Sequence, residues 1–197
     1  MDEEFDSQGV AARTLSADTE TLILVDLDDR EVGHMSKERC HQGRGILHRA
    51  FSLLIFNDAG ELLLQQRSAH KRLWPLYWSN SCCSHPRRNE SVEAAITRRL
   101  CEELGISCPL EFLFKFQYQA QFDADGAENE LCSVYIGQCV QRLRVNQREI
   151  HNWCWISQEA LQAEMTGIGA ARSFTPWFRL EWEQIQREHR SALPTAQ

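Results

Sequence analysis

The run from residue 79 to residue 106 constrains this chain more than any other stretch. It begins with the polar segment SNSCCSHPRRNE, which places Cys83 two residues before His85. It ends with RRLCEELGI, where the adjacent carboxylates of Glu102 and Glu103 come just before a glycine. A glycine directly after periodic apolar residues is typical of a helix end. The run therefore predicts a loop leading into a helix, and its thiol, imidazole and carboxylates suit proton transfer or diphosphate chemistry.

Hydrophobic patterns along the rest of the chain predict a mixture of strands and helices. Apolar runs and apolar–polar alternation predict strands at 21–27, 45–57, 61–67, 112–122, 129–140 and 151–157. Helical spacing and capping residues predict helices at 90–104, 157–165 and 175–189. Residues 74–86 are predicted to form an irregular, tryptophan-rich loop. This order of elements favours an α+β fold, with a mixed sheet packed between helices.

The length of 197 residues is enough for one domain with a buried core. The acidic, polar start predicts a disordered tail over residues 1–18, then a folded domain at 19–190 and a C-terminal tail at 191–197. No apolar run approaches the ~20 residues that cross a bilayer. The start of the chain also lacks the apolar core of a signal peptide.

The net charge of −7 argues against a general nucleic-acid surface, so an anionic small molecule would need a local basic pocket. Eight cysteines could suggest disulfides, but most lie within apolar segments of a chain without an export signal. We therefore expect reduced thiols and a cytoplasmic protein. We expect a monomer or weak homodimer with a small-molecule substrate, and no nucleic-acid or membrane partner.

The predicted helix resembles the Nudix box. The matching positions are Glu90, Arg98, Leu100, Glu102, Glu103, Gly105 and Ile106. Two positions depart from the pattern, because Ser84 replaces the opening glycine and Arg99 replaces the first glutamate of an Arg-Glu pair. In Nudix hydrolases the helical acids hold several Mg²⁺ ions for diphosphate cleavage. The resemblance implies a Nudix-like fold with a reduced metal site, and the departures argue against hydrolysis.

Further motifs, in family order from about Leu22 to Arg187, resemble the type 1 isopentenyl-diphosphate isomerases, a branch of the Nudix superfamily. One local departure is Leu76, where the family usually has glycine after a proline. Any one motif is weak, but the ordered set is specific. The matching segments are Asn80-Ser81-Cys82-Cys83-Ser84-His85-Pro86, Tyr118 with Glu128 and Glu130, Lys37 with His41 and LHRAF (47–51), Gln66-Arg67 with Lys71, and Pro176-Trp177.

The resemblance implies an isomerase that interconverts isopentenyl and dimethylallyl diphosphate through a tertiary carbocation. Cys83 and Glu130 would supply the acid and base on opposite faces of the alkene. Tyr118 would hydrogen-bond Glu130, and the ring face of Trp177 would stabilise the cation. A buried structural thiol is the ordinary interpretation of a cysteine, and we apply it to the other seven cysteines, including Cys82.

The resemblance also implies two metal sites. Imidazole and carboxylate ligands suit a transition metal such as Mn²⁺ or Zn²⁺. Two of its ligands, Glu128 and Glu130, are two residues apart, so on one strand they would share a face; the acidic stretch 123–130 would equally fit a solvated turn. Glu103 would hold Mg²⁺ on the substrate diphosphate, whereas Glu102 could equally be a solvated helix acid. The implied ligands of the transition metal are His41, His48, His85, Glu128 and Glu130.

Four residues would bind the diphosphate oxygens according to the same resemblance: Lys37, Arg67, Lys71 and Ser84. Two other functional classes stay open from the sequence. One is a Nudix hydrolase acting on a nucleoside or prenyl diphosphate, which phosphate release would reveal. The other is a non-catalytic binding module that has kept the fold.

Overall fold

The computed structural model describes residues 17–124, 126–167 and 172–194. Most of the tail predicted at 1–18, and the last three residues of the tail predicted at 191–197, lie outside these ranges. The described elements follow in the order β1 (Thr21–Val25), β2 (Glu31–Ser36), α1 (Lys37–Cys40), β3 (His48–Phe56), β4 (Leu62–Arg67), β5 (Trp78–Ser79), β6 (Cys82–Ser84), α2 (Val92–Leu104), β7 (Glu111–Asp123), β8 (Gly126–Gln138), β9 (Ile150–Ile156), α3 (Gln158–Met165), α4 (Pro176–Glu188) and the 3₁₀ helix η1 (Arg190–Ala192).

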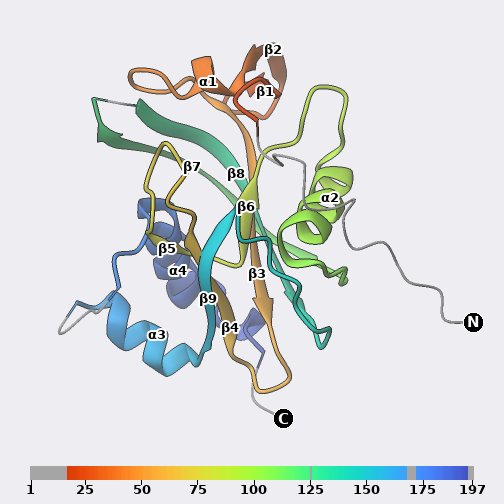
Figure 1. Cartoon of the computed structure of the whole chain (residues 1–197), viewed down its shortest axis with the longest axis vertical. Helices are drawn as coiled ribbons and strands as arrows, with labels where there is room; N and C mark the ends of the chain where they lie inside the picture. Colours follow the sequence, from red (N-terminus) through yellow and green to blue (C-terminus); the bar gives the residue numbers. More distant parts are fainter. Residues whose placement is uncertain (1–16, 125, 168–171, 195–197) are drawn as a thin grey trace, which may run out of the picture.

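Strand β3 organises the described sheet (Figure 1). One edge of β3 pairs in parallel with β8 along its whole length, beginning with His48 opposite Glu130. The other edge pairs antiparallel with β6 and, at single positions, with β1 and β4. β7 extends the sheet beyond β8, while β5 and β9 both pair with β4. The predicted mixed sheet is confirmed.

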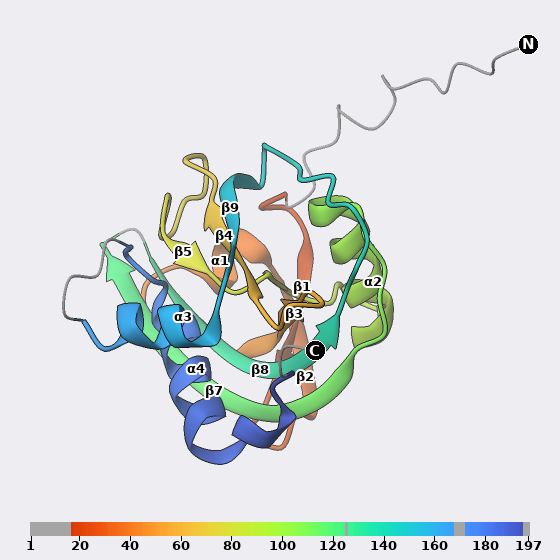
Figure 2. The same ribbon diagram turned by 90° about the horizontal axis from the view of Figure 1, so that it is seen from below.

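Each face of the sheet is covered by a helix, as Figures 1 and 2 show for α2 and α4. Alternate residues of a strand point to opposite faces. On β3, Ala50 and Leu54 join the core that includes α4, whereas Leu53 and Ile55 join the core that includes α2. The predicted α+β architecture, with the sheet between helices, is therefore confirmed.

Helix α2 begins and ends where the sequence indicates. The Ser91 side chain caps its start by accepting a hydrogen bond from the Ala94 amide at 3.2 Å. Gly105 ends it in the left-handed conformation, with a φ of 66°. A β-carbon at Gly105 would lie 2.8 Å from Cβ of Arg144, so packing as well as backbone conformation requires glycine there.

The predicted strand at 21–27 is confirmed as β1, but its hairpin partner β2 and the short helix α1 were not predicted. The segment EVGHMS of β2 has no fully buried position, so it lacks the apolar alternation that indicates a strand. A turn in which Asp29 has a φ of 61° joins the two strands. This hairpin matters for the site because it delivers α1, whose last turn carries His41 as its C-cap.

The loop predicted at 74–86 contains the short strands β5 and β6. They are held to the sheet by side chains as well as by pairing: the Ser81 hydroxyl donates to the Leu63 carbonyl at 2.7 Å and accepts from the Ile55 amide at 2.8 Å. Leu76 has a φ of 62°, in the region that favours glycine. The turn is thus formed with leucine at the position where the resemblance leads us to expect glycine.

The two ends of the described chain both contact the folded body. Leu193, within the predicted C-terminal tail, is buried in the core that includes α4. Ala17 and Asp18, at the other end, line the cavity described below. Among the described helices, none combines the length and the apolar character needed to span a membrane.

Candidate active site

The register of β3 with its two neighbours brings predicted site residues together. His48 lies directly opposite Glu130 of β8, and Ser52 lies directly opposite Cys83 of β6. Opposed residues point to the same side of a sheet, and every second residue of β3 shares that side. Cys83, His48 and Glu130 therefore lie on one side of the sheet, and Cys83 packs against the core that includes α4.

Tyr118 reaches Glu130 across the β7–β8 pair. The two residues are directly opposed, and the Tyr118 hydroxyl donates to Oε2 of Glu130 at 2.7 Å. Glu128 lies two residues earlier on β8. Both glutamates are only 7% exposed, so they do not belong to a solvated turn. Their shared face and the predicted Tyr118–Glu130 hydrogen bond are confirmed.

Five buried side chains form what we call the His–Glu cluster. Nε2 of His41 lies 2.7 Å from Oε2 of Glu128, and Nε2 of His85 lies 2.8 Å from Oε1 of Glu130. All five candidate ligand atoms lie within 4.8 Å of one another. Ligands bound at about 2.1 Å to one ion are at most about 4.2 Å apart, so small adjustments would bring all five onto one metal. The members are His41, His48, His85, Glu128 and Glu130.

Backbone carbonyls fix the tautomer of two of these histidines. Nδ1 of His41 lies 2.6 Å from the Lys37 carbonyl, and Nδ1 of His48 lies 2.7 Å from the Ile46 carbonyl. Because a carbonyl only accepts, each Nδ1 carries the hydrogen and each Nε2 presents a lone pair to the cluster. Burial lowers the pKa of His48 to about 4. Both rings are thus arranged as metal ligands usually are, with the outer nitrogen held by a protein acceptor.

Several atoms of the His–Glu cluster are buried without a hydrogen-bond partner among the described residues. They include Nε2 of His41, Nε2 of His48 and Oε2 of Glu128. The close approach of His41 to Glu128 thus lacks the geometry of a hydrogen bond. Buried polar atoms nearly always have a partner, and those that do not often mark an ion or a water molecule. The donor set therefore fits a divalent transition metal.

The two glutamates of the cluster differ in their affinity for protons. Burial opposes ionisation of Glu128, but His41 outweighs it and lowers the pKa of Glu128 to about 2. Burial and the neighbouring Glu128 raise the pKa of Glu130 well above its usual value. Two buried carboxyl groups this close do not both ionise readily. Glu130 is therefore the member of the pair that more readily holds a proton.

A cavity of about 490 Å³ opens beside the His–Glu cluster. It is lined by every predicted site residue except His48 and Glu103. His48 lies behind the cavity wall, with its side chain fully buried. The residues on the wall are Ala17, Asp18, Lys37, His41, Arg67, His70, Lys71, Arg72, Leu73, Cys83, Ser84, His85, Arg99, Tyr118, Glu128, Glu130 and Trp177.

The adjacent cysteines of β6 face opposite sides of the sheet. Cys83 is partly exposed and lines the cavity. Burial raises the pKa of its thiol to about 12, although the Arg67 guanidinium acts in the opposite direction. Cys82 is fully buried in the core that includes α2, and its thiol lies 3.4 Å from Oε1 of Glu103. Only the Cys83 thiol, held in its neutral form, is placed to meet a ligand.

Trp177 lies in the first turn of α4, with one ring face toward a cation. Pro176 precedes it at the first helical position. The indole nitrogen donates to the Ser79 hydroxyl at 3.1 Å. The Arg67 guanidinium lies 5.1 Å from the ring centroid, and Trp74 meets the ring edge-on at 5.2 Å. The ring is thus held from several sides and already makes one cation–π contact.

The predicted diphosphate ligands all lie on the cavity wall, but their present partners differ. Arg67 donates to the backbone carbonyls of Leu73 and Trp74, at 2.9 and 3.0 Å. Burial and the nearby Lys71 ammonium lower the pKa of Lys37 to about 8. Several cations beside one small cavity attract an anionic ligand, because the low-dielectric walls of the cavity focus their electric field.

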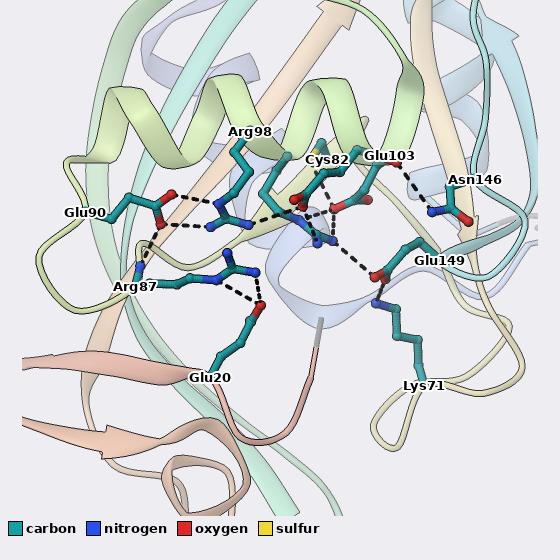
Figure 3. Close-up of polar contacts among 11 residues, drawn as sticks. Glu20, Lys71, Cys82, Arg87, Glu90, Arg98, Glu103, Asn146 and Glu149 are labelled. Atoms are coloured by element: carbon teal, nitrogen blue, oxygen red, sulfur yellow. Dashed lines mark hydrogen bonds and ion pairs between the residues drawn. The ribbon is translucent and has the colours of Figure 1, made fainter. Parts of the chain in front are cut away.

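A second group of buried charges lies beside α2, and we call it the Arg–Glu cluster. Arg99 donates through Nε to Oε1 of Glu103 at 2.9 Å, and its guanidinium is 3.5 Å from Oε1 of Glu149. Glu149 in turn pairs with Lys71, as the dashed lines of Figure 3 show. Burial opposes the charge of Arg99, but Glu103 and Glu149 raise its pKa. The members are Lys71, Arg99, Glu102, Glu103 and Glu149.

Glu103, the predicted ligand of a second cation, is occupied by protein partners. It accepts hydrogen bonds from Arg99, is 3% exposed and is not on the cavity wall. Arg99, in contrast, is on that wall. Where the Nudix box has a glutamate, this protein thus presents a guanidinium to the cavity.

Two functional candidates were not predicted from the sequence. Arg99 departs from the Nudix box, and the loss of an acid there could have suggested an anion-binding role. Glu149, which holds both Arg99 and Lys71, lies outside every motif. Its position follows only from the packing of the segment before β9 against α2, so no local signal could have identified it.

Comparisons with known proteins agree on the family. The NUDIX domain model matches residues 46–178. The Isopentenyl-diphosphate Delta-isomerase of Serratia proteamaculans is 45% identical over 81% of this chain and 87% of its own length. The enzyme of the same name from Burkholderia multivorans is 42% identical over 81% of this chain and 89% of its own length.

The solved structures add support for the fold. The crystal structure of DR0079 from Deinococcus radiodurans superposes with a TM-score of 0.67 at 21% identity, covering 86% of this chain and 99% of that one. Its identity is too low to bear on activity, whereas the relatives above 40% identity match nearly their whole length. The chain therefore belongs to the Nudix superfamily and, within it, to the family of isopentenyl-diphosphate Delta-isomerases.

Proposed function

We propose that this protein interconverts isopentenyl diphosphate and dimethylallyl diphosphate, a step of isoprenoid biosynthesis. One observation supports this reaction most directly: Cys83, Glu130 and Trp177 line the same cavity as the cations that would bind a diphosphate. The family relatives, which carry the name isopentenyl-diphosphate Delta-isomerase, support the same activity. The substrate is thus a small-molecule diphosphate with an alkene tail.

The reaction moves a double bond by adding a proton at one carbon and removing another two bonds away. We propose that Cys83 and Glu130 supply the acid and base on opposite faces of the alkene. The Cys83 thiol is neutral at physiological pH, and Glu130 is held by the Tyr118 hydroxyl. The neutral thiol could therefore donate a proton, and the carboxyl group held by Tyr118 could accept one.

The intermediate of this route is a tertiary carbocation, which water would trap. Trp177 is 3% exposed and lines the cavity. A ring face stabilises a desolvated cation by about 2 kcal/mol or more. We propose that Trp177 stabilises the positive centre while the enclosed cavity excludes water.

We propose that the His–Glu cluster holds one Mn²⁺ or Zn²⁺ ion. When bound, such an ion would supply positive charge that keeps both carboxyl groups deprotonated and in place. Its ligands would be the two lone pairs fixed by backbone carbonyls, on His41 and His48, together with His85 and the two glutamates.

We propose that the diphosphate binds Lys37, Arg67, Lys71 and Ser84, and that Arg99 contributes from the Nudix helix. Mg²⁺ would accompany the substrate, with Glu103 as its protein ligand. For Glu103 to reach that ion, its pairing with Arg99 must open, because both residues are buried together. An arriving diphosphate would draw Arg99 toward the cavity and so free the carboxylate.

Product analysis separates this proposal from hydrolysis. Isopentenyl diphosphate would be incubated with the protein, Mg²⁺ and Mn²⁺, and followed by proton NMR together with a phosphate assay. We expect dimethylallyl signals and no phosphate release. Phosphate release with an unchanged alkene would favour the hydrolase, and no change in either readout would favour a binding module.

We further propose that the protein works in the cytoplasm as a monomer or weak homodimer, without a nucleic-acid partner. Its eight cysteines are free thiols in the structure, several of them within the two cores, which suits a reducing compartment. Sedimentation of the purified protein across a range of concentrations would test the oligomeric state.

A further inference from the structure

Glu181 is a buried carboxyl group that the proposed reaction does not use. It lies on α4, one turn after Trp177, and its exposed fraction is 0%. Oε2 accepts a hydrogen bond from the Ser52 hydroxyl at 2.7 Å. Oε1 is buried without a hydrogen-bond partner among the described residues. A fully buried position in a helix would ordinarily hold an aliphatic side chain, because burying a carboxyl group costs free energy. Its presence here suggests a specific role.

A chain of hydrogen bonds connects Glu181 to the ring of Trp177. The indole nitrogen of Trp177 donates to Ser79 at 3.1 Å, and the Ser79 hydroxyl donates to Oδ1 of Asn80 at 2.8 Å. Nδ2 of Asn80 donates to Ser52 at 2.8 Å, and Ser52 donates to Glu181. Every donor points the same way, so Glu181 is the final acceptor of the chain.

The same chain also touches the strand that carries the thiol. Nδ2 of Asn80 donates to the Cys82 carbonyl at 2.8 Å, and Ser52 lies directly opposite Cys83 in the β3–β6 pair. Asn80, Ser52 and Ser79 are all fully buried. Loss of the final acceptor would leave the Ser52 hydroxyl to seek another partner, and the hydrogen bonds that Asn80 and Ser79 make earlier in the chain would then readjust.

We propose that Glu181 is a positioning residue that, through Ser52, Asn80 and Ser79, fixes the orientation of the Trp177 ring at the reaction cavity. This inference rests on the proposed role of Trp177 in the isomerase reaction. It assigns Glu181 no contact with the substrate, since Glu181 does not line the cavity.

The protonation state of Glu181 indicates which substitution should preserve its role. Burial raises the pKa of Glu181 to about 8, although the hydrogen bond from Ser52 acts in the opposite direction. At neutral pH the side chain is therefore mostly an uncharged acid that accepts through one oxygen. Glutamine has the same shape and the same accepting oxygen, whereas leucine keeps the bulk and accepts nothing.

Two-dimensional NMR of the indole N–H groups tests the inference without relying on activity. The Trp177 signal, one of six, is the one that disappears in Trp177→Phe. We expect Glu181→Leu to shift or broaden this signal, and Glu181→Gln to leave it near its original position. Glu183→Leu, at an exposed site on the same helix, is the matched control and should not move it. An unmoved Trp177 signal in Glu181→Leu would overturn the inference.

Kinetics provide the second readout. We expect Glu181→Leu to lower kcat about 10-fold with little change in KM, well below the roughly 10²-fold that a 1 Å misplacement can cost. In a Trp177→Phe background, which has no indole N–H, Glu181→Leu should change kcat by less than about 2-fold, because positioning effects on one group are not additive. Glu181→Gln should restore near-normal turnover.

The outcomes separate the inference from the proposed function. An equal loss of kcat in both backgrounds, or glutamine as slow as leucine, would overturn the positioning role. A wild-type protein without isomerase activity would instead refute the proposed function, while the NMR signal would still decide whether Glu181 orients the ring. If Glu181→Leu does not fold, Ser52→Ala interrupts the same chain one step earlier, and the same shift of the Trp177 signal is expected.

Discussion

The His–Glu cluster and the Arg–Glu cluster are both buried groups of charge near one cavity, but they are completed in different ways. In the His–Glu cluster, ligand atoms of His41, His48 and Glu128 lack hydrogen-bond partners among the described residues. In the Arg–Glu cluster, Glu103 pairs with Arg99, and Glu149 pairs with both Arg99 and Lys71. The His–Glu cluster is therefore suited to an added metal cation, whereas the Arg–Glu cluster already contains the cationic side chains of Arg99 and Lys71.

This difference explains how a Nudix helix can serve a reaction other than hydrolysis. The Nudix box places acids on the helix to gather metal ions, but here Arg99 occupies one of those positions and neutralises the remaining acids. The candidate metal site lies instead on the sheet, where the β3–β8 register places His48 beside Glu130. The proposed proton-transfer groups lie next to that site, and Arg99 of the helix would contribute positive charge toward the proposed diphosphate.

The largest expected effect is on kcat, and it should distinguish two neighbouring thiols that lie on opposite sides of the sheet. Cys83→Ala should lower kcat by about 10²–10⁴-fold, because it removes a proton-transfer group. Cys82→Ala, next to the Arg–Glu cluster, should keep most of the activity. Steady-state kinetics, with circular dichroism to confirm folding, measure both. Near-normal turnover by Cys83→Ala would remove the thiol from the mechanism.

The next effect concerns the stability of the Arg–Glu cluster. Arg99→Met leaves two buried carboxylates without their main cation, and breaking a buried pair in this way costs about 3–5 kcal/mol in the free energy of unfolding. Arg187→Met, which breaks exposed pairs on α4, should cost no more than about 1 kcal/mol. Urea denaturation compares the two. A cost below 1 kcal/mol for Arg99→Met would mean that the cluster is not self-neutralised as described.

Removal of the metal should affect the His–Glu cluster and leave the Arg–Glu cluster unchanged. Elemental analysis should find about one transition metal per chain, which prolonged chelation removes together with activity. An ion present at 100 times its dissociation constant stabilises the folded state by about 2.7 kcal/mol, so the apoprotein should melt earlier. His48→Gln should lose the metal, whereas Glu103→Gln should retain it. Full activity after exhaustive chelation would rule out the metal site.

The smallest effect concerns the ring of Trp177, which lines the cavity between the proposed reacting groups and cations. Loss of a desolvated cation–π contact of about 2 kcal/mol slows a reaction about 30-fold. Trp177→Leu should therefore slow turnover strongly, Trp177→Phe only moderately, and neither should change KM much, since the diphosphate provides most of the binding. Equal rates for the two variants would make Trp177 a packing residue only.

Much of this site could be predicted from the sequence because its residues lie in recognisable local motifs. The helix end at Gly105 and the alternation on β7 follow from short-range rules, and Cys83 and Glu130 follow from the family resemblance. The hairpin of β1 and β2 could not be predicted, because its second strand buries no complete face.

Contacts between residues far apart in the chain could not be predicted from the sequence either. Nothing local indicates that Glu149 pairs with Arg99, or that Glu181 accepts a hydrogen bond from Ser52, 129 residues earlier. Both contacts depend on how separate elements pack against α2 and β3. Charged residues buried by tertiary packing resemble surface charges in a one-dimensional pattern, so the departure from the Nudix box at Arg99 did not reveal that this side chain is buried beside the cavity.

Deuterium incorporation tests the central claim most directly. Isopentenyl diphosphate is incubated with the metal-loaded protein in D₂O, and the products are followed by proton and deuterium NMR. We expect dimethylallyl diphosphate carrying deuterium, with the diphosphate intact and no label when Cys83→Ala replaces the wild type. Release of phosphate from an unlabelled, unrearranged alkene would contradict it.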